Sequence, residues 1–220
     1  MRASIAAALL LVPTIVMSQS RYVRYTQGST IGFGLLDGEV IRELRGDMFT
    51  VHEETGKQLR LSDVTLLPPV APGKVIAVGL NYKSHIGGRP PAVYPGLFAK
   101  YPTSIVPSGA EIVLPSDARN AHFEGEMVIV IGKPAKNLSP EQAKTHVFGV
   151  TAGNDVSERD WQRSDLQWFR AKASDTFAPL GPAVVTGLNY GDLLLQTRVN
   201  GEVVQSQRTR DLIFDVPTIV

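Results

Sequence analysis

The sequence contains no cysteine among its 220 residues. This absence excludes disulfide bonds, thiolate zinc sites and cysteine nucleophiles, and it leaves the redox compartment undetermined. An excess of charge of one sign is also lacking, because 22 Lys and Arg residues against 21 Asp and Glu residues give a net charge of +1. No basic face emerges, so nothing indicates a nucleic-acid partner. With 43% hydrophobic residues, the composition argues against wholesale disorder.

Long apolar runs are absent except near the N-terminus, where residues 5–17 follow Arg2 and precede the small, polar residues 18–20. A single positive charge, a short apolar run and a small residue at the cleavage position are typical of a secretory signal peptide. The run is short for a membrane span and Pro13 interrupts it, so no stable span is predicted. A signal peptide at residues 1–20 predicts an exported protein, periplasmic or secreted. Translation from Met17 is the alternative and predicts a cytoplasmic one.

Strand patterns dominate the rest of the sequence. Short alternating runs at 22–25, 31–36 and 40–44, separated by glycine-containing turns, predict a small antiparallel β domain over residues 21–70. The proline-rich segment 67–73 predicts a boundary, followed by a catalytic domain over residues 71–220. Further strands are expected at 74–80, 96–99, 111–114, 122–132, 147–154 and 183–187.

Other local signals complete the prediction of a β-rich α+β fold. Asn200-Gly201 between two apolar runs predicts a hairpin with a type I′ turn. Helical patterns are few: residues 139–147, where Ser139 is a candidate N-cap, and residues 157–168. Pro217 lies near the start of one more element, within which the sequence ends, so the catalytic domain is expected to be incomplete at its C-terminus.

Two glutamates form the most informative motif. Glu124 and Glu126 are two apart on a predicted strand, so their side chains are expected on the same face. Carboxylates placed there, leading into five apolar residues, would repel each other and lose hydration, and a divalent cation would offset both effects. Carboxylate oxygens without cysteine suit Mg²⁺, Mn²⁺ or Ca²⁺ rather than zinc. The alternative, two ordinary glutamates at a solvated strand end, is favoured for an isolated Glu-x-Glu motif.

A second acidic segment strengthens the metal hypothesis. Asp155 ends an apolar strand and is well placed as a third hard ligand. Arg159 and Gln162 follow it and share a face if the segment is helical, where they would suit a substrate carboxylate. The alternative is an ordinary aspartate near a helix start and a surface arginine.

Two further residues are candidates for proton and charge handling. His85 lies just past a predicted strand and could be a general base, although a lone histidine is more often structural or exposed. Lys172 could offset the negative charge of an enolate, with Asp175 holding the lysine in place. The alternative for this pair is a surface ion pair in a loop.

Taken together and in this order, these stretches resemble the fumarylacetoacetate hydrolase family over about residues 21–220. The resemblance rests on an ordered set rather than on any single motif. The matching residues are 79–82 with His85, 98–100 with 102–104, Glu124-Gly125-Glu126 with 130–133, 154–157 with Arg159, Asp160 and Gln162, Lys172 with Asp175, 181–182 and 199–202.

The resemblance implies the family's mixed β-sandwich roll with a small N-terminal β domain, usually as a homodimer. It implies Mg²⁺ or Mn²⁺ held by Glu124, Glu126 and Asp155. It also implies a small oxo-acid substrate whose 2-oxo-carboxylate the metal chelates, with an enolate that Lys172 supports. Tyr82, Arg159 and Gln162 would bind and orient that substrate. Family members hydrolyse C–C bonds in acylpyruvates, decarboxylate oxaloacetate or isomerise 2-hydroxy-diene-dioates from aromatic catabolism.

The sequence departs from the family pattern in two places. Family hydrolases carry a glutamate about one helical turn after the histidine, whereas residues 86–91 contain no acid, two glycines and two prolines. A hydrolase of this family is the expected class, with an isomerase or a decarboxylase as the alternatives. The missing acid adds weight to isomerisation or tautomerisation, and it motivates a rival hypothesis, a non-catalytic, exported metal- or acid-binding protein. The family's Gly-Thr-Pro segment would lie beyond Val220. Serine-hydrolase and nucleotide-binding motifs are absent, so those classes are disfavoured.

Overall fold

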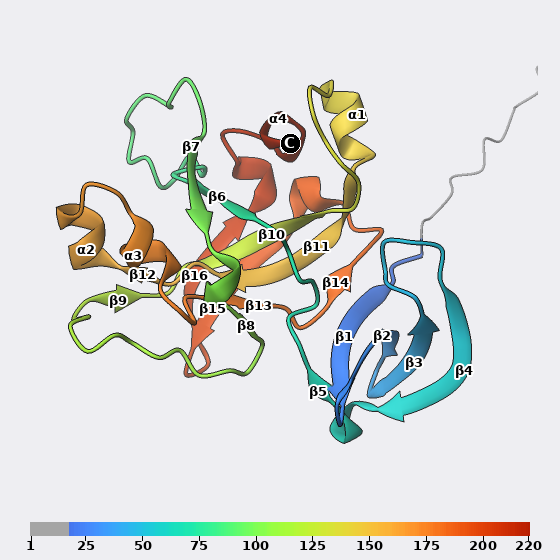
Figure 1. The fold of residues 1–220 in the computed structure, drawn as a ribbon. Helices are drawn as coiled ribbons and strands as arrows, with labels where there is room; N and C mark the ends of the chain where they lie inside the picture. Colours follow the sequence, from blue (N-terminus) through green and yellow to red (C-terminus); the bar gives the residue numbers. More distant parts are fainter. Residues whose placement is uncertain (1–17) are drawn as a thin grey trace, which may run out of the picture.

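The computed structural model describes residues 18–220 (Figure 1). The signal-peptide prediction concerns mainly residues 1–17, which lie outside the described residues, so it stays a prediction. Within residues 18–220, no helix combines the length and the apolar character that crossing a membrane requires.

The N-terminal part is an antiparallel meander, as the alternating runs predict. It comprises β1 (Arg21–Gln27), β2 (Thr30–Asp37), β3 (Val40–Arg45) and β4 (Glu53–Arg60), and β5 (Thr65–Leu66) pairs with β1. Alternate side chains point to one face and bury a core of Val23, Tyr25, Ile41 and Leu59. The meander lies at the lower right of Figure 1.

This meander continues into a larger mixed sheet instead of standing apart from it. The strand order is β4-β3-β2-β1-β14-β11-β13-β8, and β10 pairs with β11 off this path. The added strands are β8 (Ile105–Pro107), β10 (Gly125–Ile131), β11 (Val147–Asn154), β13 (Ala178–Leu180) and β14 (Val184–Val185). A second core of Met48, Val70, Val130, Leu180 and Val184 lies against this sheet.

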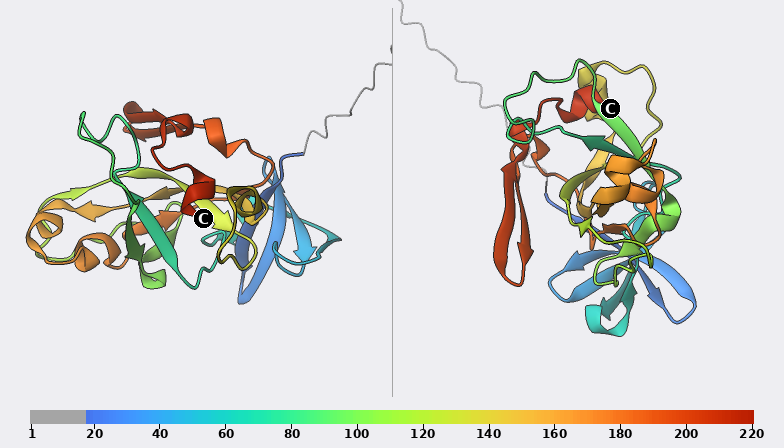
Figure 2. Two further views of the ribbon diagram at one scale, coloured as in Figure 1. Left: turned by 90° about the horizontal axis from the view of Figure 1, so that it is seen from above. Right: turned by 90° about the vertical axis from the view of Figure 1, so that its left-hand side faces the viewer.

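Three strand pairs flank the large sheet: β6 (Val75–Gly79) with β7 (Gly96–Lys100), β9 (Ala121–His122) with β12 (Ser157–Glu158), and β15 (Leu194–Val199) with β16 (Glu202–Arg208). The β15–β16 hairpin forms an arm along one side of the molecule (Figure 2). Asn200 has φ 50° and Gly201 φ 89°, so the type I′ prediction is confirmed.

Helices are few and short, which confirms the β-rich α+β prediction. They are α1 (Pro140–Lys144), α2 (Arg159–Ser164), α3 (Phe169–Ala173) and α4 (Val216–Ile219), with 3-10 turns at Leu61–Asp63, Pro102–Ser104, Tyr190–Asp192 and Thr209–Asp211. Ser139 caps α1 as predicted, because its hydroxyl accepts a hydrogen bond from the Gln142 backbone N–H.

Three local predictions are wrong. Residues 111–114 form no strand; the Val113 N–H donates instead to the hydroxyl of Thr176. The expected strand over 122–132 is interrupted before β10, where the Glu124 N–H donates to the side chain of Asn154. The expected helix over 157–168 begins later, because residues 157–158 pair with β9, and it ends at Ser164.

Candidate active site

The junction of β10 and β11 places two of the candidate acids side by side. Glu124 directly precedes β10, and Asp155 directly follows β11. The Asp155 N–H donates to the Glu124 carbonyl over 2.8 Å, and the Glu124 N–H donates to the Asn154 side-chain oxygen over 2.9 Å. These bonds fasten the two strand ends together, so residues 31 positions apart in the sequence meet at one point.

Two buried lysines lie against these acids. The Lys172 ammonium, on α3, is 2.7 Å from an oxygen of Glu124 and 2.7 Å from one of Asp155. Lys100, at the end of β7, donates to the other oxygen of Asp155 and to the Val156 carbonyl. Only 3% of Lys172 and 5% of Lys100 are exposed, so their three ion pairs with Glu124 and Asp155 are largely removed from water.

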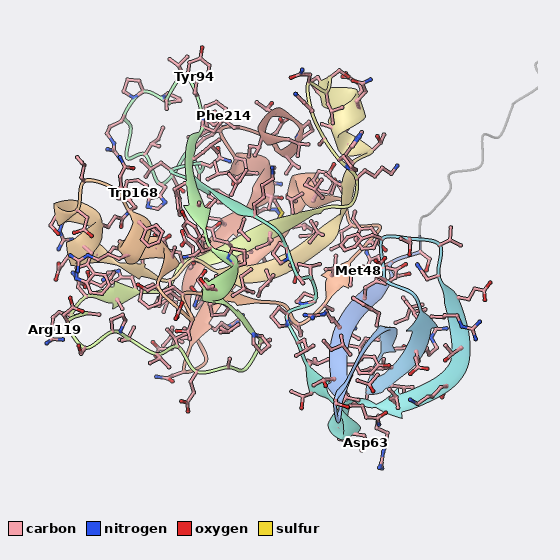
Figure 3. All side chains as sticks on the ribbon, in the orientation of Figure 1. Met48, Asp63, Tyr94, Arg119, Trp168 and Phe214 are labelled. Atoms are coloured by element: carbon pink, nitrogen blue, oxygen red, sulfur yellow. The ribbon has the colours of Figure 1, made fainter. Side chains whose placement is uncertain are left out.

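Aromatic packing holds α3 against β7 and thereby positions the lysines. The rings of Phe98 and Trp168 meet edge to face at 5.6 Å, and the Lys172 ammonium lies 4.9 Å from the Phe98 ring centroid. Figure 3 shows Trp168 between the helical region and β7.

The start of α2 supplies the third cation. The Arg159 guanidinium donates to Gln162 over 2.7 Å and also to Glu124, so the predicted shared face of Arg159 and Gln162 is confirmed. The fully buried Glu158 caps this helix: its carboxylate accepts hydrogen bonds from the backbone N–H groups of Trp161, Asn120 and Arg119. The anchored cap fixes the position from which the guanidinium reaches the site.

The three acids have different pKa values because their surroundings differ. Burial acts to raise the pKa of Glu124, but Lys172 and Arg159 oppose it and lower that pKa to about 2. Burial raises the pKa of Asp155 above its ordinary value, against the opposing effect of its two lysine partners. Burial, followed by the charges of Asp155 and Glu124, raises the pKa of Glu126 to about 8.

Glu126 stands out because it lacks a partner. Hydrogen bonds from Lys100, Lys172 and Arg159 reach its two neighbouring acids, but among residues 18–220 none reaches the Glu126 carboxylate. A partly buried carboxylate without a donor is unfavourable unless it is protonated or binds a cation. The site therefore has oxygen donors and one carboxylate without a partner, to which a hard divalent cation could bind.

The geometry does not by itself display a metal centre. In the described part of the chain, no group of three His, Asp or Glu side chains is arranged to enclose an ion. The lysines explain this: Lys172 lies between Glu124 and Asp155, and Lys100 takes the remaining Asp155 oxygen. The assignment of Glu124, Glu126 and Asp155 as ligands stays a prediction.

Tyr82 and His85 lie on the segment that joins β6 to β7. Tyr82 is half-buried near Glu126, and burial together with the Glu126 charge raises its pKa to about 12. His85 is exposed, and no ion pair or hydrogen bond joins its ring to another residue of the described part. The segment continues as turns without a helix up to Tyr94 at its outer edge (Figure 3). The structure thus brings Tyr82 to the acids but leaves His85 on the surface.

One predicted partnership is wrong, and one residue was missed. Asp175 is exposed and does not hold Lys172, whose ammonium turns inward to Glu124 and Asp155. The interior acids are the stronger partners because water screens a buried ion pair poorly, and Arg159 and Lys100 pair with the same two acids. Lys100, the last residue of β7, belongs to the same cluster; it lies in the stretch 98–100 that matches the family, but the sequence predicted no role for it in the site.

Comparisons with known proteins place these features in context. Residues 74–220 match the family model "Fumarylacetoacetate (FAA) hydrolase C-terminal", and residues 20–69 match "Rv2993c-like, N-terminal". The structure of 2-hydroxyhepta-2,4-diene-1,7-dioate isomerase from Mycobacterium marinum is 43% identical with a TM-score of 0.84, covering 91% of this chain and 79% of that one.

Two further similar proteins are named for other activities. Maleylpyruvate hydrolase from Sphingobium sp. SYK-6, in complex with manganese (II) ion and pyruvate, is 27% identical with a TM-score of 0.72, covering 90% of this chain and 80% of that one. The mitochondrial oxaloacetate tautomerase FAHD2A of Homo sapiens is 42% identical over 167 residues, 72% of this chain. The chain spans only about half the length of that human protein, at 53%.

Proposed function

Because the chain belongs to the fumarylacetoacetate hydrolase family, we propose that it is an enzyme that binds Mg²⁺ or Mn²⁺ and transfers a proton within a small 2-oxo or enol dicarboxylate. The observation that carries this proposal is the partly buried cluster of three acids and three cations, in which Glu126 is the one acid without a hydrogen-bond partner among residues 18–220. A relative that was solved with manganese and pyruvate, itself a 2-oxo acid, supports it.

Glu124, Glu126 and Asp155 would hold the cation, because their carboxylate oxygens suit a hard divalent ion and no cysteine competes. When bound, the cation would supply a Lewis acid that polarises a 2-oxo group. Ca²⁺ would satisfy the same oxygen donors but is a weaker Lewis acid, so Mg²⁺ or Mn²⁺ is the better match to the chemistry.

The charge balance of the cluster indicates a dianionic substrate. The ionised acids carry three negative charges, and Lys100, Lys172 and Arg159 carry three positive ones, so a divalent cation leaves an excess of two positive charges. A dicarboxylate returns the buried site to neutrality, which favours joint binding of cation and substrate. A neutral or singly charged ligand would leave excess positive charge in a cluster that is poorly hydrated.

The residues of the chain then have separate tasks. The planar Arg159 guanidinium, oriented by Gln162, can grip a substrate carboxylate through two parallel hydrogen bonds. The Lys172 ammonium, held inside the site, can balance the negative charge that develops when a proton leaves the carbon next to a carbonyl. Tyr82 lies beside Glu126 and would contact the substrate, and His85 is the base that the exposed segment can bring to it.

Proton transfer is favoured over C–C bond hydrolysis. Hydrolysis needs a group that activates water, and no acid follows His85 within residues 86–91, where the backbone forms turns. Isomerisation and tautomerisation need only the removal and return of a proton. The isomerase and the tautomerase among the similar proteins support this choice.

The test measures turnover of oxaloacetate, a 2-hydroxy-diene-dioate and an acylpyruvate, each with and without Mg²⁺ or Mn²⁺. We expect metal-dependent keto–enol conversion or diene isomerisation, and loss of both in Glu126→Gln but not in Glu111→Gln, an exposed control outside the cluster. If cleavage of the acylpyruvate is the main reaction, the protein is a hydrolase and the proposal of an isomerase or tautomerase is wrong. Metal binding without any turnover would favour the hypothesis of a non-catalytic binding protein. Failure to bind either metal would refute the proposed cation site.

A further inference from the structure

The β15–β16 hairpin touches the acidic strand at the glycine between the two glutamates. The Gly125 N–H donates to the Gln205 side-chain oxygen over 2.9 Å, and the Gln205 amide nitrogen donates to the Gly125 carbonyl over 2.7 Å. One side chain thus satisfies both backbone groups of Gly125, as a neighbouring strand would.

This contact occurs on the free side of the strand. Gly125 faces Asn154 of β11 in the ladder, and its own N–H and C=O point the other way, toward Gln205. The Gln205 amide therefore forms hydrogen bonds with the N–H and C=O groups of Gly125 that point away from β11. Gly125 is the residue between Glu124 and Glu126. Without it, this edge would have no hydrogen-bond partner in the described part of the chain.

A neighbouring side chain fixes the orientation of the Gln205 amide. The Thr197 hydroxyl, on the opposite strand of the hairpin, donates to the Gln205 oxygen over 2.9 Å, so the oxygen faces the Gly125 N–H. A Cβ atom on Gly125 would lie 2.0 Å from that hydroxyl oxygen and 3.2 Å from the Gln205 oxygen. Only glycine allows the hairpin to approach this closely, which explains why the middle residue of the Glu-Gly-Glu motif is a glycine.

The same face of β16 also reaches the segment that carries His85. Gln207, two residues after Gln205 and therefore on the same side of the strand, donates to the Ser84 hydroxyl over 2.5 Å. The hairpin consequently contacts both the acidic strand and the residue before His85.

From this arrangement we infer that Gln205 is a positioning residue: it fixes the backbone at Gly125 and so holds the Glu124 and Glu126 carboxylates in place for a divalent cation. The inference rests on the cation site proposed above. It extends the site to the hairpin, 80 residues further along the chain, which contributes no carboxylate to it. Partners that orient the ligands of a metal typically affect its affinity when they are removed.

The test compares Gln205→Met, which keeps the size of the side chain and removes both hydrogen bonds, with Gln196→Met. Gln196 is exposed on the same hairpin and contacts Ser206 and Arg198, not Gly125. The Mn²⁺ dissociation constant is measured by electron paramagnetic resonance, the exchange rate of the Gly125 amide by NMR, and overall stability by thermal unfolding.

We expect Gln205→Met to weaken Mn²⁺ binding roughly 10- to 100-fold and to speed Gly125 amide exchange, with little change in the unfolding midpoint. Gln196→Met should match the wild type in all three measurements. If Gln205→Met does not fold, Thr197→Val, which removes only the hydroxyl that orients the amide, should weaken Mn²⁺ binding by a smaller factor.

Two outcomes overturn the inference, and they can be told apart. Wild-type Mn²⁺ affinity and wild-type Gly125 exchange in folded Gln205→Met, or in Thr197→Val where the first variant does not fold, would remove the role of Gln205 alone and leave the proposed function intact. A wild-type protein that binds no Mn²⁺ would overturn the cation site itself, and this role with it.

Discussion

The pKa of Glu126 predicts how cation binding depends on pH. Without a cation this partly buried carboxyl has a pKa of about 8, because burial and the charges of Asp155 and Glu124 oppose its ionisation. At neutral pH it therefore carries a proton, which a cation must displace. Glu124, with a pKa of about 2, is ionised throughout the neutral range and contributes nothing to this dependence.

The size of the effect follows from a single displaced proton. With a pKa of about 8, the ionised fraction of Glu126 rises about 50-fold from pH 6 to pH 8 and less than about twofold beyond it, and the apparent affinity for Mg²⁺ or Mn²⁺ rises in proportion. At pH 7 binding should release about 0.9 proton per ion, by the same relation. The affinity thus increases with pH and levels off above pH 8.

Calorimetric titration with Mn²⁺ in buffers of different ionisation enthalpy measures both the affinity and the number of protons released. Glu111→Gln should keep the pH dependence, whereas Glu126→Gln should bind weakly with a flat profile. A steeper dependence, with more than one proton released, would mean that Asp155 also titrates, since burial raises its pKa as well. An affinity that is constant from pH 6 to pH 8, with no proton released at pH 7, would refute the reasoning.

Three further predictions concern stability and substrate binding. In the cation-free protein the free energy of unfolding should fall between pH 5 and pH 8, because Glu126 has a folded pKa of about 8 against 4.5 in the unfolded chain; thermal unfolding of Glu126→Gln should lack this contribution. Arg159→Lys should raise KM for a dicarboxylate about tenfold and change kcat less, since an ammonium cannot form the two parallel hydrogen bonds of a guanidinium. Steady-state kinetics measure both constants. Gly125→Ala should lower the free energy of unfolding in urea by about 1–3 kcal/mol, because its Cβ would lie 2.0 Å from Thr197; Gly73→Ala, which meets no atom within 4 Å, is the matched control, and equal effects would contradict the argument.

Much of the fold could be predicted from local sequence signals. The antiparallel meander, the Asn200-Gly201 hairpin and the Ser139 cap each depend on a few adjacent residues, so the sequence carries their full cause. The strand expected at 111–114 was wrong because a local pattern alone does not determine whether a strand forms. Its apolar residues satisfy a β pattern, but whether such a run finds a partner strand is decided by distant parts of the chain.

The candidate site could be predicted less completely. The acids and Arg159 occur in motifs that the family resemblance identifies, and in the structure Glu124, Asp155 and Arg159 belong to one network of ion pairs. Lys100 and Gln205 are a different case, because each acts through a contact with a residue 55 or 80 positions away. No periodicity encodes such a pairing, and a lysine or glutamine on a short strand is ordinarily solvated.

The error over Asp175 shows which physical effect decides the partners of Lys172. Asp175 is only three residues away, and proximity in sequence suggested an ion pair. A surface pair of this kind contributes little, because water already solvates both charges. Inside the site, the ammonium lies between two acids where water screens charge poorly, so its attraction to them is stronger than to an exposed aspartate. Glu126 is the one acid of the cluster that no hydrogen bond from residues 18–220 reaches, and a divalent cation, bound together with a dianionic substrate, would be its partner.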